Sequence, residues 1–276
     1  MAAQSLFATL FPSDCRLCGA ALTEVSRLPV CAACVGSIHR IEAPTCTVCG
    51  ELVPGAETGS EMRCGMCQRA RMPFAKAVAF GSYDGALRGL IHLLKYDRVR
   101  PAANVLGRMV AEAMAGLKFA EPTKTPLLIP VPLYAGRERQ RGFNQAEETA
   151  RAALRVSPTL APKSTARTWG TVALELNTSA LRRTRETQSQ TGLTRHQRRA
   201  NLRGAFIAAR PQEIAGREVV LVDDVYTTGT TAYECARVLR RAGAVEVYVA
   251  TAARVLKAEV PGAPAEDPAV TVRAQA

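Results

Sequence analysis

Two adjacent carboxylates and a hydroxyl-rich segment lie close together late in this chain of 276 residues. Asp223 and Asp224 follow the four apolar residues 219–222, a run typical of a buried strand. The segment behind them contains Thr227, Thr228, Gly229, Thr230 and Thr231. Free backbone N–H groups at a helix start bind phosphate, and carboxylates accept hydrogen bonds from hydroxyls. This order of residues therefore predicts a sugar-phosphate site.

A helical pattern follows the threonine segment. Its apolar positions are Ala232, Cys235, Ala236 and Leu239. This spacing indicates an amphipathic helix, and Gly243 is placed to end it. Gly229 would let the backbone turn tightly and approach the ligand. Because Cys235 lies on the apolar face of the helix, we expect it to be a core thiol.

Residues 219–231 resemble the phosphoribosyl-pyrophosphate (PRPP) motif of type I phosphoribosyltransferases. The resemblance implies that Asp223 and Asp224 hold the ribose 2′- and 3′-hydroxyls and that residues 227–231 hold the 5′-phosphate. The alternative is an acidic strand end in a nucleotide hydrolase, but that class needs a glycine-rich loop with a Gly-Lys pair. The chain contains no Gly-Lys pair, so we favour the sugar-phosphate interpretation.

Eight of the nine cysteines form four C-x-x-C pairs, separated by 12, 11 and 14 residues. The pairs are Cys15/Cys18, Cys31/Cys34, Cys46/Cys49 and Cys64/Cys67. This spacing fits two tetrahedral zinc sites with four cysteine ligands each. We expect sequential ribbons, the first pair with the second and the third with the fourth. The spacing alone leaves an interleaved cross-brace open.

Disulfides and redox motifs are the alternatives for these cysteines. A disulfide framework needs an oxidising compartment, and the N-terminus shows no basic region and only a short, interrupted apolar stretch. Four C-x-x-C motifs in tandem are not a usual redox arrangement. No apolar run approaches the length of a membrane span. We therefore expect two structural zinc ions in a protein without a membrane span.

The cysteine pairs end at Cys67, and alternating strand and helix patterns begin after Pro73. We predict strands at 76–83, 127–132, 172–176, 218–224 and 245–251. This alternation indicates an α/β domain with a mainly parallel sheet, which binds ligands at the carboxyl ends of its strands. The predicted domains are a double zinc ribbon at 1–72, a phosphoribosyltransferase-like domain at 73–256 and a disordered tail at 257–276.

The first arginine cluster follows the predicted strand 127–132. Arg137, Arg139 and Arg141 alternate in what we interpret as a loop, and guanidinium forks suit pyrophosphate oxygens. A solvated basic loop is the alternative. Lys95, at the end of a predicted helix, either binds the ligand or only complements the helix dipole.

The second cluster, residues 181–204, has seven arginines and one acid, and its net charge of +6 is half of the chain's +12. The arginines are Arg182, Arg183, Arg185, Arg195, Arg198, Arg199 and Arg203. This bias indicates an anionic partner, either the ligand's pyrophosphate, a nucleic-acid backbone, or both. Aromatic residues are absent from the segment, which weakens a base-stacking interpretation.

The order of these parts resembles the ComF family, bacterial proteins with zinc ribbons before a phosphoribosyltransferase-like domain. The resemblance rests on the cysteine pairs, Leu94-Lys95-Tyr96, Val131-Pro132, residues 141–145, Arg183, Thr187, Gln190, Arg198, Asn201 and the PRPP motif. It covers roughly residues 12–252, with 156–180 the least recognisable part. It implies a cytoplasmic role in natural competence with single-stranded DNA and with helicase or recombination proteins of DNA uptake.

Several functions are compatible with these features. As an enzyme, the protein would transfer a phosphoribosyl group from PRPP, bound with Mg²⁺, to an unknown acceptor. As a binding module, it would use PRPP to organise other contacts, and the sequence shows no recognisable nucleobase pocket. A third interpretation makes the ribbons a protein-docking platform without nucleic-acid contact. Glutamine amidotransfer is rejected, because residue 2 is alanine and every N-terminal cysteine is paired.

Overall fold

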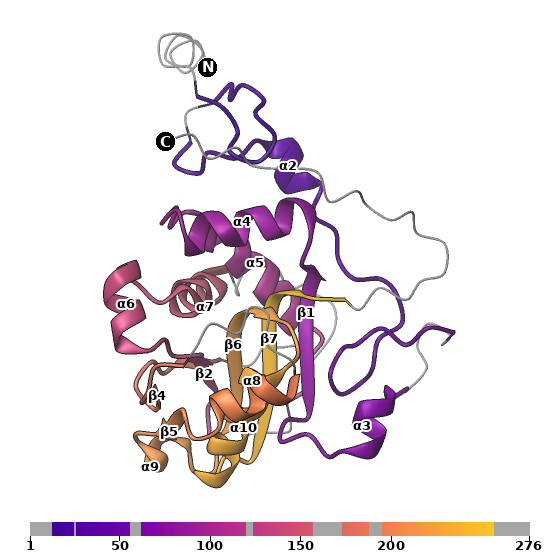
Figure 1. The fold of residues 1–276 in the computed structure, drawn as a ribbon, viewed down its shortest axis with the longest axis vertical. Coiled ribbons are helices and arrows are strands. Elements are labelled where there is room, and N and C mark those ends of the chain that lie inside the picture. Colours follow the sequence, from indigo (N-terminus) through magenta and orange to yellow (C-terminus); the bar gives the residue numbers. More distant parts are fainter. Residues whose placement is uncertain are drawn as a thin grey trace.

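A five-stranded sheet forms the centre of the fold, in the order β1-β7-β6-β2-β3 (Figure 1). The computed structural model describes residues 13–24, 26–55, 62–119, 124–156, 173–187 and 195–256, so the predicted tail lies outside it. The strands are β1 (Lys76–Ser82), β2 (Leu127–Pro130), β3 (Glu175–Leu176), β6 (Glu218–Tyr226) and β7 (Glu246–Arg254). Every neighbouring pair is parallel, which confirms the predicted α/β class.

Helices cover both faces of the sheet, as the apolar run of β6 requires. The main helices are α4 (Gly85–Lys95), α5 (Ala102–Met114), α7 (Gln145–Val156) and α10 (Thr230–Arg241). Side chains of α4, α5 and α7 form one apolar cluster with Val220 and Val222. Helix α10 belongs to a second cluster, with Val219 and Leu221. Cys235 is fully buried there, which confirms it as a core thiol.

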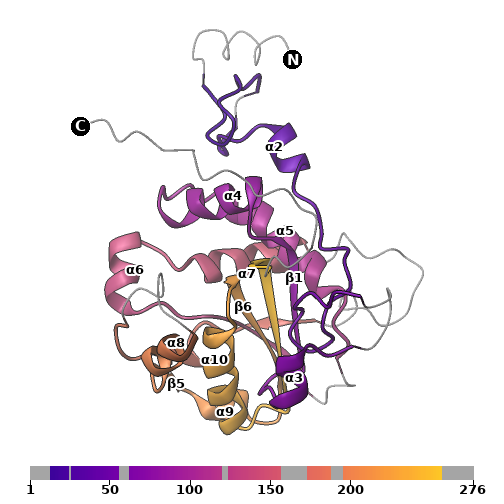
Figure 2. The ribbon, with the colours of Figure 1, turned by 45° about the vertical axis from the view of Figure 1, so that its right-hand side comes forward.

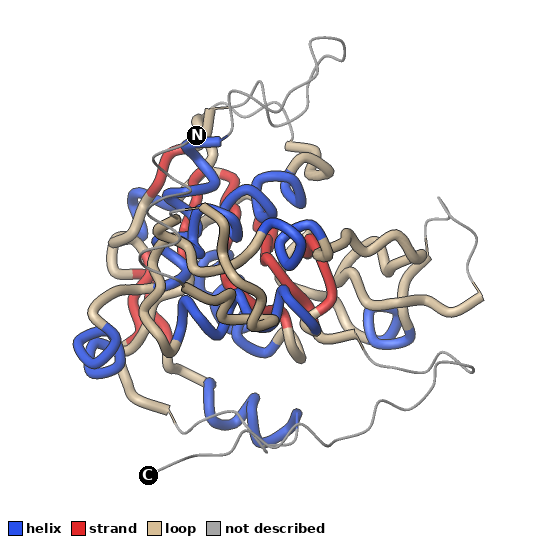
Figure 3. The backbone as a smooth tube through the Cα atoms, turned by 90° about the horizontal axis from the view of Figure 1, so that it is seen from above, coloured by secondary structure: helices blue, strands red, loops and turns tan. Residues whose placement is uncertain are grey.

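The remaining elements are short. They are α2 (Ala32–Gly36), α3 (Gly65–Arg69), α6 (Ala135–Arg141), α8 (Arg195–Leu202), α9 (Pro211–Ile214), β4 (Leu181–Arg183) and β5 (Phe206–Ala208). Strands β4 and β5 form a separate antiparallel pair. Figure 3 shows how helices and loops surround the strands when the molecule is seen from above.

The two cysteine-rich halves of the N-terminal region lie apart. Figures 1 and 2 place α2 and α3 toward opposite ends of the molecule. The first half adds Cys15 and Val30 to the apolar cluster of α4 and α5, whereas the second adds Cys46 and Cys49 to the cluster of α10. Each half therefore packs on a different face of the α/β domain.

Strand β6 continues beyond the acidic pair, although the sequence predicted that it would end there. It pairs with β7 as far as Tyr226, which lies opposite Arg254. On its other side, β2 ends at Pro130, opposite Val222, where a proline removes the ladder's donor. Asp223 and Asp224 thus lie where one neighbouring strand has ended and the other continues.

The segment around Arg137 is a helix, not the predicted loop. Arginine, glutamate and glutamine are good helix formers, and they fill most of α6. Gly142 ends the helix in the left-handed conformation, with φ of 85°. The arginines are therefore distributed around a helix.

Candidate phosphate-binding site and metal centres

Asp223 and Asp224 lie on opposite faces of the sheet. Successive side chains of a strand alternate between faces, so Asp223 lies on the α10 side and Asp224 on the α4 side. Asp224 is buried, and its Oδ2 atom lies 2.7 Å from the Nζ atom of Lys95. The fold therefore brings Lys95 to the acidic pair from a distant helix.

The threonine segment lines a narrow hollow at the start of α10, together with Asp223. Its residues at this hollow are Thr227, Gly229, Thr230 and Thr231. The hydroxyl oxygen of Thr228 lies 2.9 Å from that of Thr230. Because α10 begins at Thr230, its first turn lies at this hollow, and the start of a helix favours a bound anion.

Gly229 is required here for two reasons. Its φ of 72° lies in the left-handed region, where a side chain is strained. A Cβ atom added to it would clash with the hydroxyl oxygen of Tyr226. Any larger residue would therefore displace either the loop or the tyrosine.

Asp223 and Lys95, two ionisable groups next to Asp224, differ in how their pKa values are shifted. Burial, followed by repulsion from Asp224, raises the pKa of Asp223 to about 7. Burial lowers the pKa of Lys95, but attraction to Asp224 outweighs it, so this pKa is raised. Lys95 therefore remains an ammonium group at neutral pH and compensates Asp224. Asp223 is poised to gain or lose a proton near neutrality.

Two arginines of α6 share a face, and the third does not. Arg137 donates to the carbonyl oxygen of Thr187, 3.3 Å away. Arg141 donates to the side chain of Gln145 and lies 5.9 Å from the ring centre of Tyr96. Arg139 is exposed. Arg137 and Arg141 are four residues apart, the spacing that places side chains on one face of a helix.

Arg183, a member of the second arginine cluster, is a further candidate for binding the ligand's pyrophosphate. Its guanidinium donates to the Thr187 hydroxyl and lies 5.5 Å from the ring centre of Phe206. Burial and the nearby Arg137 lower its pKa, while Asp223 acts in the opposite direction. Its buried Nε atom has no hydrogen-bond partner among the described residues. The sequence pointed to Arg183 only as a member of the second arginine cluster and of the ComF resemblance, and not as an individual ligand residue.

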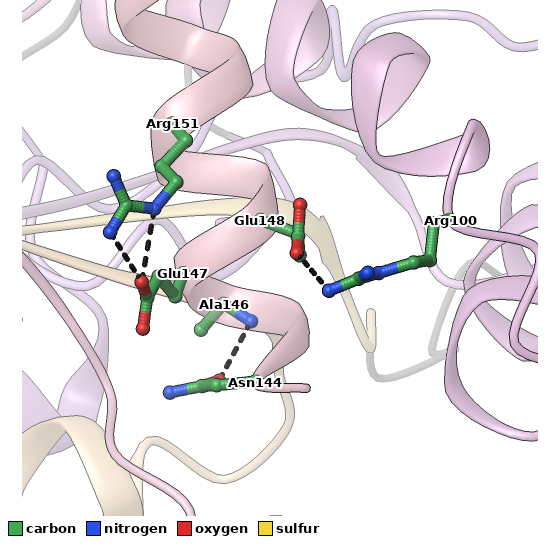
Figure 4. Close-up of polar contacts among 6 residues, drawn as sticks. All are labelled: Arg100, Asn144, Ala146, Glu147, Glu148 and Arg151. Atoms are coloured by element: carbon green, nitrogen blue, oxygen red, sulfur yellow. Dashed lines mark hydrogen bonds and ion pairs between the residues drawn. The ribbon is translucent and has the colours of Figure 1, made fainter. Parts of the chain in front are cut away.

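Asn144 fixes the start of α7 beside this site (Figure 4). Its Oδ1 atom accepts from the backbone N–H of Ala146, and its Nδ2 atom donates to the carbonyl oxygen of Val131, both at 3.0 Å. Val131 in turn donates its N–H to Val222, 2.8 Å away. The buried asparagine thereby holds the segment after α6 against the end of β2.

The cysteine sulfur atoms gather into two clusters, each within 4.8 Å. The clusters are Cys15, Cys18, Cys31 and Cys34, and Cys46, Cys49, Cys64 and Cys67. This confirms the sequential pairing. Sulfur pairs lie 3.6–3.9 Å apart, and four ligands at about 2.3 Å from a tetrahedral zinc would lie about 3.8 Å apart. Both clusters therefore have the dimensions of a zinc site.

The thiols also have the electrostatics of a metal site. Burial raises the pKa of Cys15, but backbone N–H groups, first that of Cys31, lower it to about 6. Hydrogen bonding to Cys18 and burial raise the pKa of Cys34 to about 12. The four thiols therefore cannot all ionise at neutral pH unless a cation is bound.

Arg254 ties the second cluster to the sheet. This buried residue, with 2% of its surface exposed, donates from Nη1 to the carbonyl oxygen of Cys49. Its Nη2 atom lies 3.2 Å from Glu51 Oε2. No sequence pattern indicates this contact, because residues about two hundred positions apart meet only in the folded chain.

None of the helices in the described part of the chain has the length and apolar character that a membrane crossing requires.

Comparison with known proteins gives two domain families. The double zinc ribbon domain matches residues 6–68, and the phosphoribosyl transferase domain matches residues 141–266. The DNA utilization protein YhgH of Escherichia coli O157:H7 is 32% identical over 246 residues, covering 89% of this chain and 98% of that protein. Competence protein F of Haemophilus influenzae is 32% identical over 230 residues, covering 79% and 94%. Competence protein ComFC of Bacillus subtilis is 23% identical over 220 residues, covering 78% and 79%. The chain therefore belongs to the ComF family, in which a double zinc ribbon precedes a phosphoribosyltransferase domain.

Proposed function

We propose that the protein binds PRPP, with Mg²⁺, at the end of β6. The single observation that carries this proposal is the hollow that Asp223 shares with the threonine segment at the first turn of α10. The backbone N–H groups and hydroxyls of residues 227–231 would hold the 5′-phosphate. Asp223 would accept hydrogen bonds from the ribose hydroxyls, and Asp224 would join it once Lys95 turns toward the pyrophosphate.

The pyrophosphate would lie between α4 and α6. Lys95 and the arginines Arg137 and Arg141 supply cationic groups there, and Arg183 adds a fourth from the α10 side. Arg139, which is exposed on α6, would contribute only through its charge. The Mg²⁺ would travel with the ligand and share the pyrophosphate charge.

Two structural zinc ions would complete the protein. The sulfur spacing and the pairing of the thiols support one zinc in each cluster. Each zinc would hold its half of the N-terminal region on a different face of the sheet. Neither cluster contacts the acidic pair directly, so we assign both a structural role.

As an enzyme, the protein would transfer the phosphoribosyl group to an acceptor of unknown structure, with loss of pyrophosphate. Its own residues would position the sugar and stabilise the positive charge that develops on it, without a covalent nucleophile. As a module without catalysis, it would use the same contacts to sense PRPP and dock other proteins.

We further propose that the protein acts in the cytoplasm on incoming single-stranded DNA during natural competence. Support comes from the names of its relatives, a DNA utilization protein and a competence protein. The net charge of +12 favours an anionic partner. Helicases or recombination proteins of DNA uptake are the protein partners that such a role would require.

Two measurements on the same protein separate these proposals. Calorimetry with PRPP and Mg²⁺ tests binding, and pyrophosphate release with and without single-stranded DNA or free bases tests transfer. Binding with release supports the enzyme, and binding without release supports the sensing module. Absence of binding would contradict the PRPP site itself.

A further inference from the structure

A groove of about 660 Å³ lies between the second cysteine cluster and helix α10. One wall is formed by residues on either side of α3, among them Arg63 and Arg71, and the other by α10. The groove is separate from the acidic pair and from the threonine hollow, since it shares no lining residue with that hollow.

The groove is strongly basic. Five arginines line it, against one acid, Glu246. Arg237 is paired with Glu234 at 2.7 Å, and Arg240 lies 3.7 Å from Glu246. The other three, which are exposed and form no ion pair with a described acidic side chain, are Arg63, Arg71 and Arg241. Because solvated protein surfaces normally mix both signs, three uncompensated arginines in one groove indicate an anionic ligand.

The groove also offers apolar and aromatic surface. Met72 and Phe74 line it on the side of the cysteine cluster, and half-buried Tyr233 lines it on α10. Tyr233 donates its backbone N–H to Gly229, so this end of the groove begins next to the threonine segment. The distance along α10 from Tyr233 to Arg241 is about 12 Å. A ligand that contacts both Tyr233 and Arg241 must therefore extend along the groove.

We infer that this groove binds a single-stranded nucleic acid, an inference that rests on the DNA part of the proposed function. Arginine forks bind phosphate oxygens bidentately, and a basic groove with an aromatic side chain is the usual surface for single strands. An acidic peptide would supply carboxylates but no bases to stack on Tyr233. The groove is also walled on two sides, which suits one strand.

The second arginine cluster is the rival surface. Two of its members already form intramolecular hydrogen bonds. Arg183 donates to Thr187, and Arg185 donates to the carbonyl oxygens of Asn201 and Arg203. Helix α8, which carries Arg195, Arg198 and Arg199, contacts α10. The two surfaces therefore flank one helix and can be tested against each other.

The test compares three triple variants of the full zinc-bound chain. The groove variant carries Arg63→Ala, Arg71→Ala and Arg241→Ala. The α8 variant carries Arg195→Ala, Arg198→Ala and Arg199→Ala. The matched control carries Arg27→Ala, Arg88→Ala and Arg108→Ala, which removes three exposed arginines that do not line the groove. Binding of an oligothymidylate of about twenty nucleotides is followed by fluorescence anisotropy at about 50 and 200 mM salt.

We expect the groove variant to lose at least about tenfold in affinity relative to the matched control and to show a flatter salt dependence. If the groove variant holds less zinc than the wild type, the single substitution Arg241→Glu is tested in its place, because Arg241 is distant from the cysteines in sequence. We expect it also to weaken oligonucleotide binding. Equal binding by the groove variant and the matched control would overturn the inference, as would a loss confined to the α8 variant. If the wild type binds a polyglutamate peptide but no oligonucleotide, both this inference and the proposed role with DNA are wrong. The proposed PRPP site is tested separately by calorimetry and does not depend on this result.

Discussion

The guanidinium of Arg254 lies over the ring of Tyr226, with 5.0 Å between its Cζ atom and the ring centre. The same guanidinium holds the Cys49 carbonyl oxygen and Glu51, beside the second cysteine cluster. The Tyr226 hydroxyl lies against Gly229 in the threonine segment. One buried arginine thus connects the second cysteine cluster to the candidate phosphate site.

This contact predicts that Arg254→Lys weakens PRPP binding as well as stability. Lysine keeps the charge but cannot donate to two partners as a planar fork and stacks poorly on tyrosine. Loss of one charge-assisted hydrogen bond of this guanidinium should cost about 1.5–3 kcal/mol. Thermal melting and calorimetry with PRPP measure the two effects.

Arg40→Lys is the matched control for this substitution. Arg40 also pairs with a glutamate, Glu112, and lies 5.4 Å from the ring centre of Phe80. It is exposed and does not line the threonine hollow. If Arg254→Lys melts and binds PRPP like Arg40→Lys, the proposed connection is wrong.

The double substitution Asp223→Asn and Asp224→Asn should remove most PRPP affinity without unfolding the protein. Each lost charge-assisted hydrogen bond should cost about 1.5–3 kcal/mol of binding free energy. The amides keep the volume of the acids, so the sheet should remain intact. Unchanged PRPP binding in calorimetry would refute the assignment of the acids to the ribose. Circular dichroism serves as the control and shows whether the variant is folded.

Much of this site was predictable from local patterns, but the end of the strand was not, because β6 continues past the acidic pair to Tyr226. The buried run 219–222 and the helical spacing behind it identified the strand, the turn and the helix correctly, because each is a local pattern. Strand alternation already implied that Asp223 and Asp224 face opposite sides, yet we treated them as one pair. The ion pair of Lys95 with Asp224 required the order of strands in the sheet, which no local pattern contains.

The segment Ala135–Arg141 was predicted wrongly, as a loop, for a different reason. Its composition favoured a helix, but its place after a strand and before Gly142 favoured a loop, and helix propensity prevailed. The partners of Arg183 and Arg254 depend on contacts across the whole fold. The pairing of the cysteines was left open by their spacing and follows from how each half folds on its own face of the sheet.

The pKa of Asp223 predicts a dependence of stability on pH. Because its value of about 7 in the folded protein is above the ordinary value of about 3.9, the folded state binds the proton more tightly than the unfolded state. The stability that Asp223 contributes is therefore complete below about pH 4 and is lost as the pH rises to about 7.

The measurement compares melting temperatures of ligand-free wild type and Asp223→Asn between about pH 5 and 8. We expect the wild type to lose stability relative to the variant as the pH rises to about 7, by up to about 1.4 kcal/mol per pH unit. Above that pH the difference should level off. A difference that does not change with pH would show that Asp223 titrates normally.

The zinc ions give the last prediction. Cys18→Ser should release one of two zinc ions and loosen only the half that packs on α4, leaving PRPP affinity near wild type. Cys64→Ser should release the other and also weaken PRPP binding, because Arg254 joins that cluster to Tyr226. Cys235→Ala, which removes a core thiol outside both clusters, should retain both ions.

Metal analysis, calorimetry and mass spectrometry of the purified variants test these outcomes. Wild type without zinc, or with disulfides among residues 15–67, would contradict the metal assignment, and equal PRPP affinity in the two serine variants would contradict the connection through Arg254.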